Sequence, residues 1–131
     1  MTQIVLDTNV LISALISTKG NPAQIFDKVS EGALRAIYCQ KILDEYEAVL
    51  NRPCFSFPHS SVSSALDTFK LKGIEVNPRF SQIPMTDESD RIFYDTAVTG
   101  NAILITGNLR HYPNEPFIMS PAEFFTAHCR V

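Results

Sequence analysis

The stretch "IVLDTNVLIS", which runs from Ile4 to Ser13, decides the fold. Its first three residues are apolar and predict a short buried strand, which ends at a single acid, Asp7. A small polar pair, Thr8 and Asn9, follows before the apolar residues resume. Asp7 is therefore either the cap of a following helix or a ligand at the end of a buried strand.

Short apolar runs alternate with helical periods along the rest of the chain. This alternation predicts a mainly parallel sheet that is covered on both faces, within a single domain of residues 1–131. Functional groups of such sheets gather outside the carboxyl ends of the strands, where Asp7 is expected. We expect strands at Ala33–Cys39, Gly73–Asn77, Ala102–Gly107 and Pro116–Ser120, and helices at Gln40–Leu50, Ser60–Leu71 and Asp87–Thr99 and from Asn21 and Pro121 onward.

Composition restricts the class of protein. The net charge of −3 gives no general attraction for nucleic acid, so any such contact must come from a few local cations. Three widely spaced cysteines are typical of reduced thiols in a cytoplasmic protein. No apolar run has the length of a membrane span, so we expect no membrane partner.

Two further acids are expected to point inward. On the Gln40–Leu50 helix, Glu45 lies between Ile42 and Val49 in the helical period, toward the apolar face. The alternative is a boundary glutamate whose carboxylate reaches water. Asp90 begins the apolar stripe of the Asp87–Thr99 helix, and helix-dipole stabilisation explains it less well than it explains the acid three residues earlier.

The remaining polar residues of this region have weaker assignments. Asp87 suits a helix N-terminus, and Asp95 lies about 140° from Asp90 on the helical wheel, toward another face. The segment "LITGNLRHY" leaves a predicted strand with Thr106 and Asn108, at the same edge as Asp7. A plain turn at this point is the alternative.

Carboxylates from three separate elements would repel one another unless a cation joined them. Oxygen ligands select Mg²⁺ or Mn²⁺, and such an ion can activate water for attack on a phosphodiester. His59, His111 and His128 are isolated in the sequence and are expected at surface or loop positions. Cations that follow the acids or the strand exit are the candidate contacts to the phosphates of such a substrate: Arg91, Arg110 and His111.

Several blocks of the sequence resemble PIN domains, in particular the toxins of bacterial toxin–antitoxin pairs. The similarity lies in "IVLDTNVLISAL", "ILDEYEAVLNRPCF", "DESDRIFYDTAVTGNAILITGN" and the closing "FIMSPAEFF". The resemblance implies a three-layer α/β/α sandwich around a sheet of about five strands. It also implies a Mg²⁺- or Mn²⁺-dependent endoribonuclease acting on single-stranded RNA.

The resemblance assigns roles to individual residues. Asp7, Glu45 and Asp90 would be the catalytic metal ligands, with Asn9 holding Asp7 and Thr106 near the attacked phosphate. Asn108 stands where many members have a fourth acid, which leaves the number of metal ions open. Asp87 and Asp95 would be supporting residues. A cognate antitoxin protein and a homodimer are the protein partners that the resemblance suggests.

Two other functions remain open from the sequence. A haloacid-dehalogenase-like phosphatase would also place an acid after its first strand, but it needs a second acid where Asn9 stands. A degenerate PIN or receiver-like module would bind partners without catalysis, although "ITGN" lacks the lysine that a receiver requires.

Overall fold

A parallel sheet of five strands forms the centre of the molecule, in the order β3-β2-β1-β4-β5. The computed structural model describes residues 1–129. Every pair of neighbouring strands is parallel, and β1 lies between β2 and β4. The predicted parallel sheet is therefore confirmed. Its strands are β1 (Gln3–Leu6), β2 (Arg35–Tyr38), β3 (Ile74–Glu75), β4 (Ile103–Ile105) and β5 (Ile118–Met119).

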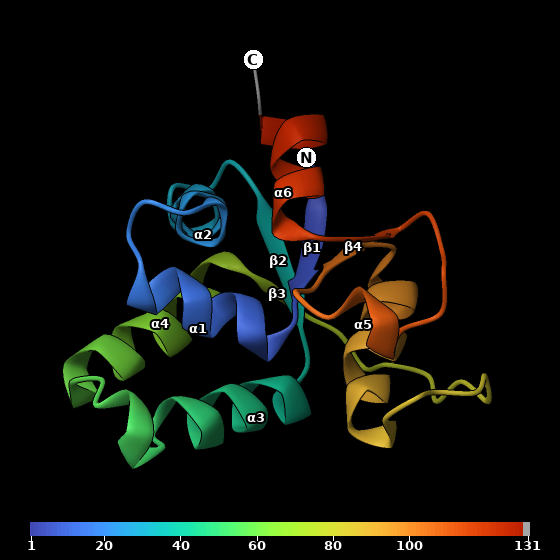
Figure 1. Ribbon diagram of the computed structural model, residues 1–131, viewed down its shortest axis with the longest axis horizontal. Helices are drawn as coiled ribbons and strands as arrows, with labels where there is room; N and C mark the ends of the chain where they lie inside the picture. Colours follow the sequence, from blue (N-terminus) through green and yellow to red (C-terminus); the bar gives the residue numbers. More distant parts are fainter. Residues whose placement is uncertain (130–131) are drawn as a thin grey trace.

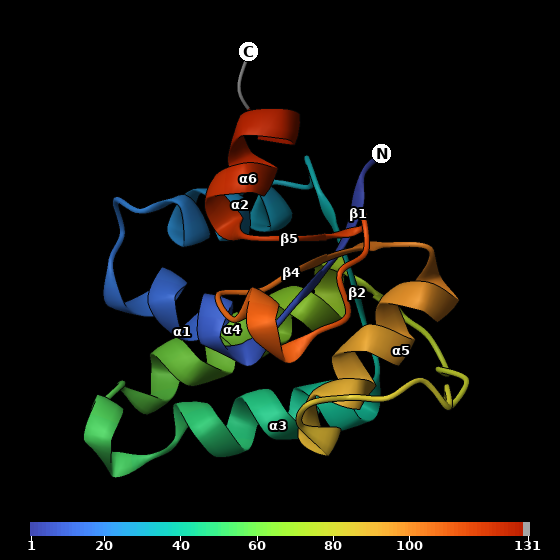
Figure 2. The same cartoon turned by 45° about the vertical axis from the view of Figure 1, so that its right-hand side comes forward.

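Helices cover both faces of this sheet, so the predicted α/β/α sandwich is also confirmed. Figure 1 shows α5 on one side of the sheet and α1, α2 and α4 on the other, and Figure 2 shows α3 running beneath the carboxyl edge. The helices are α1 (Thr8–Ile16), α2 (Asn21–Ser30), α3 (Gln40–Leu50), α4 (His59–Lys72), α5 (Arg91–Gly100) and α6 (Pro121–Phe124), which continues as a π turn, η4 (Phe125–Cys129).

The core forms where the apolar stripes predicted from the sequence meet the sheet. Ile4 and Leu104 of the central strands are fully buried, as are Ile42 and Tyr46 on the inner stripe of α3 and Phe69 of α4. Burial of such side chains contributes about 1.5–3 kcal/mol each. This core fixes the position of the carboxyl ends of β1 and β4, where the candidate site lies. In residues 1–129, no helix is both long and apolar enough to span a membrane.

Two helical segments differ from the prediction. Helix α1 was not predicted, because apolar residues occupy most of its faces and leave no clear period: Val10 and Leu11 are buried, whereas Ile16 is 64% exposed. The expected Asp87–Thr99 helix begins as a short 3-10 turn, η2 (Glu88–Asp90), before α5 starts at Arg91. Asp90 therefore lies in this turn and not within the α-helix.

Candidate active site

Asp7 is buried at the carboxyl end of β1, where side chains from three segments hold it. The Thr106 hydroxyl donates to its Oδ2 at 2.8 Å and the Tyr112 hydroxyl at 2.9 Å. The Asn9 amide adds a longer contact of 3.5 Å to the same oxygen. Although Asp7 stands at the N-cap position of α1, its side chain makes no capping hydrogen bond. The capping interpretation is therefore wrong, and the carboxylate is oriented by the site.

The exits of β1 and β4 are tied together by a second set of hydrogen bonds. The Gly107 N–H donates to Asn9 Oδ1 at 3.0 Å, and the Asn108 N–H donates to the Thr106 hydroxyl at 3.0 Å. Thr106 can thus accept from one neighbour and donate to Asp7. A Cβ at position 107 would lie 3.2 Å from Asn9 Oδ1, so glycine permits this close approach. Asn9 therefore anchors the β4 exit more firmly than it contacts Asp7.

Asp90 is half-buried near Asp7 and contacts His111. Its Oδ2 lies 3.1 Å from His111 Nδ1. Burial, followed by the charge of Asp7, raises the pKa of Asp90 above its ordinary value, and the hydrogen bond with His111 opposes this rise. The two carboxylates therefore repel each other across the strand exit, although they come from segments far apart in the sequence.

His111 is not isolated, contrary to the expectation from the sequence. It belongs to the short turn η3 (Leu109–His111), which returns the chain toward Asp90. Asp87, Asp90 and His111 offer ligand atoms that all lie within 4.8 Å of one another. Within the described residues, this group of possible metal ligands includes neither Asp7 nor Glu45. Asp87 itself caps η2 by accepting from the Ser89 N–H at 3.0 Å, as the helix-terminus interpretation predicted.

Glu45 is exposed, so the expectation that it leans into the apolar face is wrong. Ile42 and Val49 are buried on either side of it along α3, but its carboxylate reaches water from the border of that stripe. The Thr8 hydroxyl lies 3.5 Å from Glu45 Oε2. This contact places Glu45 next to the residue that follows Asp7, on the open side of the β1 exit.

Arg91 and Asp95 hold a loop and do not join Asp7. The buried Arg91 guanidinium donates to the carbonyls of Ser81 and Ile83, each at 2.7 Å, and pairs with Glu88. These contacts engage the guanidinium, so the prediction that Arg91 binds RNA loses its physical basis. Asp95 is 3% exposed and accepts from the Ser81 N–H at 3.1 Å, while its Oδ1 has no partner among the described residues. An unpaired buried acceptor costs about 1–3 kcal/mol.

Two predicted residues lie at the surface beside the strand exit. Asn108 uses its backbone N–H to fix Thr106, and its side chain is exposed. Arg110, two residues further along, is also exposed. Their positions leave both side chains free to meet a ligand that approaches Asp7 and Asp90.

Two tyrosines of the site were not predicted. Tyr112 donates to Asp7, and burial followed by the charges of Asp7 and Asp90 raises its pKa far above the ordinary value, so the hydroxyl keeps its proton. Tyr46 is fully buried and donates to the Leu6 carbonyl, directly before Asp7. A tyrosine within an apolar stripe signals a buried hydrogen-bond partner, and this signal could have identified Tyr46.

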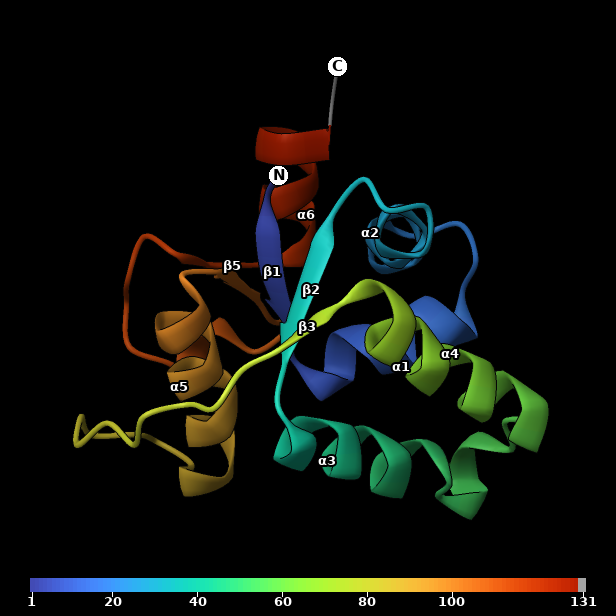
Figure 3. The same ribbon diagram turned by 180° about the vertical axis from the view of Figure 1, so that it is seen from behind.

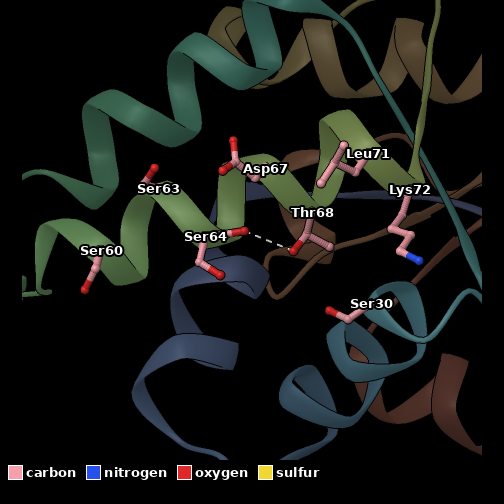
Figure 4. Close-up of a pocket in the computed structure, with 8 residues that line it drawn as sticks. All are labelled: Ser30, Ser60, Ser63, Ser64, Asp67, Thr68, Leu71 and Lys72. Atoms are coloured by element: carbon pink, nitrogen blue, oxygen red, sulfur yellow. Dashed lines mark hydrogen bonds between the residues drawn. The ribbon is translucent and has the colours of Figure 1, made fainter.

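A separate groove lies away from the candidate acids, on the face of the sheet that α1, α2 and α4 cover. It is an open groove of about 420 Å³ between α2 and α4 (Figure 4). Hydroxyl side chains dominate its walls, and the candidate acids do not contribute to it. The lining residues are Ser30, Ser60, Ser63, Ser64, Asp67, Thr68, Leu71 and Lys72.

Comparison with known proteins identifies the family. A family profile described as PIN domain matches residues 3–110. The chain belongs to the PIN domain family. Over 109 residues this PIN domain is 30% identical to MJ1680, an uncharacterized protein of Methanocaldococcus jannaschii, with 81% of this chain and 70% of the relative covered.

A solved structure shares the fold of this PIN domain. The crystal structure of VapBC2 from Rickettsia felis, bound to a DNA fragment from their promoter, contains a chain that matches with a TM-score of 0.57. The match covers 91% of this PIN domain and 97% of that chain, at 16% sequence identity. At this identity the match supports the shared architecture.

Proposed function

We propose that this PIN domain is a metal-dependent endoribonuclease that cleaves single-stranded RNA, and that it is the toxin of a toxin–antitoxin pair. The observation that carries the proposal is the oriented carboxylate of Asp7 at the carboxyl edge of the sheet, with Asp90 close enough for its pKa to respond to the charge of Asp7. Family membership supports nuclease chemistry at that edge.

The carboxylate oxygens of the site suit a divalent cation. The three side-chain donors to Asp7 all reach Oδ2, and no hydrogen bond from the described residues reaches Oδ1. Carboxylate oxygens are the ligands that Mg²⁺ and Mn²⁺ prefer, and an added cation would offset the repulsion between Asp7 and Asp90. We assign Asp7, Asp90 and Glu45 as the residues that would hold the ion.

Each part of the site has a task in this proposal. The bound cation would polarise the phosphodiester and lower the pKa of an attacking water. Thr106 and Tyr112 hold Asp7 in one orientation, and His111 holds Asp90. Arg110 and Asn108 would contact the RNA strand, because their exposed side chains border the same exit. The net charge of −3 means that these contacts must be few.

The partner is also a proposal. The crystal structure of VapBC2 from Rickettsia felis, bound to a DNA fragment from their promoter, contains a chain that shares the fold of this PIN domain. This likeness supports a cognate antitoxin protein as the partner here. We therefore also propose the cytoplasm as its location, where both its RNA substrate and a cognate antitoxin would be available.

Cleavage of a fluorescent single-stranded RNA, with Mn²⁺ or Mg²⁺ and with excess chelator, tests the proposal. We expect cleavage only with metal, and loss of cleavage in Asp90→Asn. Glu47→Gln is the control, because this acid is exposed on the same helix as Glu45. Absence of cleavage with either ion would favour a partner-binding module without catalysis.

A further inference from the structure

The loop of residues 76–87 connects β3 to η2 and contains no helix or strand. In Figure 3 it crosses α5, leaves the body of the molecule and returns to the start of that helix. Its last residue directly precedes η2, and the last residue of η2 is Asp90. The course of the 76–87 loop therefore leads straight into the turn that carries a proposed metal ligand.

One stripe of α5 holds the 76–87 loop through hydrogen bonds to its backbone. Arg91, Asp95 and Thr99 are spaced four residues apart, so they lie on the same side of the helix. The Thr99 hydroxyl accepts from the Arg79 N–H at 3.0 Å, and the Asp95 carboxylate accepts from the Ser81 N–H at 3.1 Å. Arg91 donates to the Ser81 carbonyl at 2.7 Å. The loop is thus attached to α5 at three successive turns.

Arg91 differs from the other two residues of the stripe because it also binds η2. Its guanidinium donates to the Ile83 carbonyl at 2.7 Å and pairs with the carboxylate of Glu88, the first residue of η2. A guanidinium offers five N–H donors in a fixed fork, so one group can join loop carbonyls to a carboxylate. Asp90 lies between Glu88 and Arg91 in the chain, so the residues on either side of it are tied together.

Phe80 covers one face of this guanidinium. The centre of its ring lies 4.9 Å from Arg91 Cζ, and the residue is 74% exposed. A cation over an aromatic face is attracted by the ring, and the attraction increases as water is excluded. The exposed phenylalanine therefore has a structural task, because its ring shelters the hydrogen bonds that Arg91 makes to the loop and to η2.

We infer that Arg91 is a positioning residue, which fixes Asp90 for metal binding through η2 and does not itself contact the ion. The Asp90 carboxylate has one hydrogen-bond partner among the described residues, His111, so its position otherwise depends on the backbone of η2. Arg91 joins that turn to the 76–87 loop on one side and begins α5 on the other. The inference rests on the proposed function, because that proposal assigns Asp90 as a metal ligand.

Calorimetric titration of Arg91→Ala with Mn²⁺ tests the inference, because charge and positioning predict opposite signs. Removal of a cation near a metal site would by charge alone strengthen the binding of Mn²⁺. Loss of positioning should instead weaken it, by about tenfold or more. Arg91→Lys keeps the charge but lacks the fork, so it should recover only part of the affinity and stay about threefold weaker than the native protein. This variant decides the sign if Arg91→Ala fails to fold.

Thr99→Ala is the matched control, because it loosens the same loop at the other end of the stripe. It removes the acceptor for the Arg79 N–H and leaves the contacts of Arg91 in place. The affinity for Mn²⁺ should stay within about twofold of the native value. Unchanged or tighter Mn²⁺ binding in the folded Arg91 variants would overturn the inference. Equal weakening in Thr99→Ala and Arg91→Ala would also overturn it, because any loosening of the loop would then suffice.

Amide order parameters from NMR relaxation, measured with chelator present, separate this inference from the proposed function. In Arg91→Ala we expect the order parameters of Ser89 and Asp90 to fall from about 0.85 toward about 0.6, whereas Thr99→Ala should lower that of Arg79 alone. Unchanged values at Ser89 and Asp90 in Arg91→Ala would overturn the inference. A native protein that binds no Mn²⁺, but whose η2 loses order in Arg91→Ala, would keep the hold of Arg91 on Asp90 and overturn the proposed metal site.

Discussion

Asp7 and Asp95 are both buried near the carboxyl edge of one sheet, yet their carboxylates have different hydrogen-bond partners. Asp7 receives hydroxyl donors from Thr106 and Tyr112 on one oxygen. Asp95 receives a single backbone N–H, and its other oxygen has no partner in the described part of the chain. Desolvated carboxylates need compensation, so the comparison separates a carboxylate that several side chains orient at the strand exit from one that holds a neighbouring loop.

The largest expected effect is on cleavage by Asp7→Asn. This change keeps the shape of the side chain but removes a proposed metal ligand, so cleavage should fall at least about a hundredfold. Asp95→Asn should instead keep most of the cleavage, because this acid contacts Ser81 and not Asp7. Initial rates of cleavage of a fluorescent single-stranded RNA measure both effects. If the two variants lost rate equally, the distinction between the two acids would fail.

Tyr112→Phe should give the next largest effect. Removal of its hydroxyl leaves the Asp7 carboxylate with Thr106 as its remaining close side-chain donor. Changes to groups that orient a metal ligand typically cost 10–100-fold in activity or metal affinity. The free energy of unfolding should fall by about 1 kcal/mol. Steady-state cleavage and chemical denaturation measure the two effects. Full activity in Tyr112→Phe would mean that Thr106 alone orients Asp7.

A smaller effect is expected on the stability of the metal-free protein in Asp90→Asn. Because folding raises the pKa of Asp90, its stabilising contribution is complete in acid and is lost as the pH rises through the folded pKa. The variant should therefore melt at the same or a slightly higher temperature than the native protein at pH 7, and this advantage should disappear toward pH 3. Asp67→Asn, exposed on α4, is the control. A clear loss of stability at pH 7 would mean that the Asp90 charge stabilises the fold.

Arg110→Ala should produce the smallest effect. In an Asp90→Asn background, we expect weak binding of single-stranded RNA with a salt dependence worth only about two or three phosphate contacts. Loss of the exposed Arg110 should reduce the slope of log K against log salt by about 0.7, the value of one contact to a single strand. Lys70→Ala on α4 should leave the slope unchanged. A steep slope that Arg110→Ala does not alter would place the RNA path elsewhere.

Much of the fold could be predicted because burial leaves a period in the sequence. The limits of α3 at Gln40–Leu50 follow the apolar stripe that the sequence shows. Helix α1 was missed because apolar residues occupy most of its faces. Asp7 was found because it ends a buried strand, but its partner Tyr112 lies 105 residues away and leaves no local signal. The burial of Arg91 depends on loop carbonyls whose positions no periodicity encodes.

Calorimetric titration of the metal-free protein with Mn²⁺ tests most directly whether Asp7 and Asp90 hold one ion together. We predict one site, weakened at least about tenfold by Asp7→Asn and by Asp90→Asn, and unaffected by Glu47→Gln. The contrary result would be binding that survives Asp7→Asn but is lost in Asp87→Asn and His111→Ala. The ion would then lie in the Asp87, Asp90 and His111 group, whose ligand atoms are within 4.8 Å of one another, and Asp7 would not be a ligand.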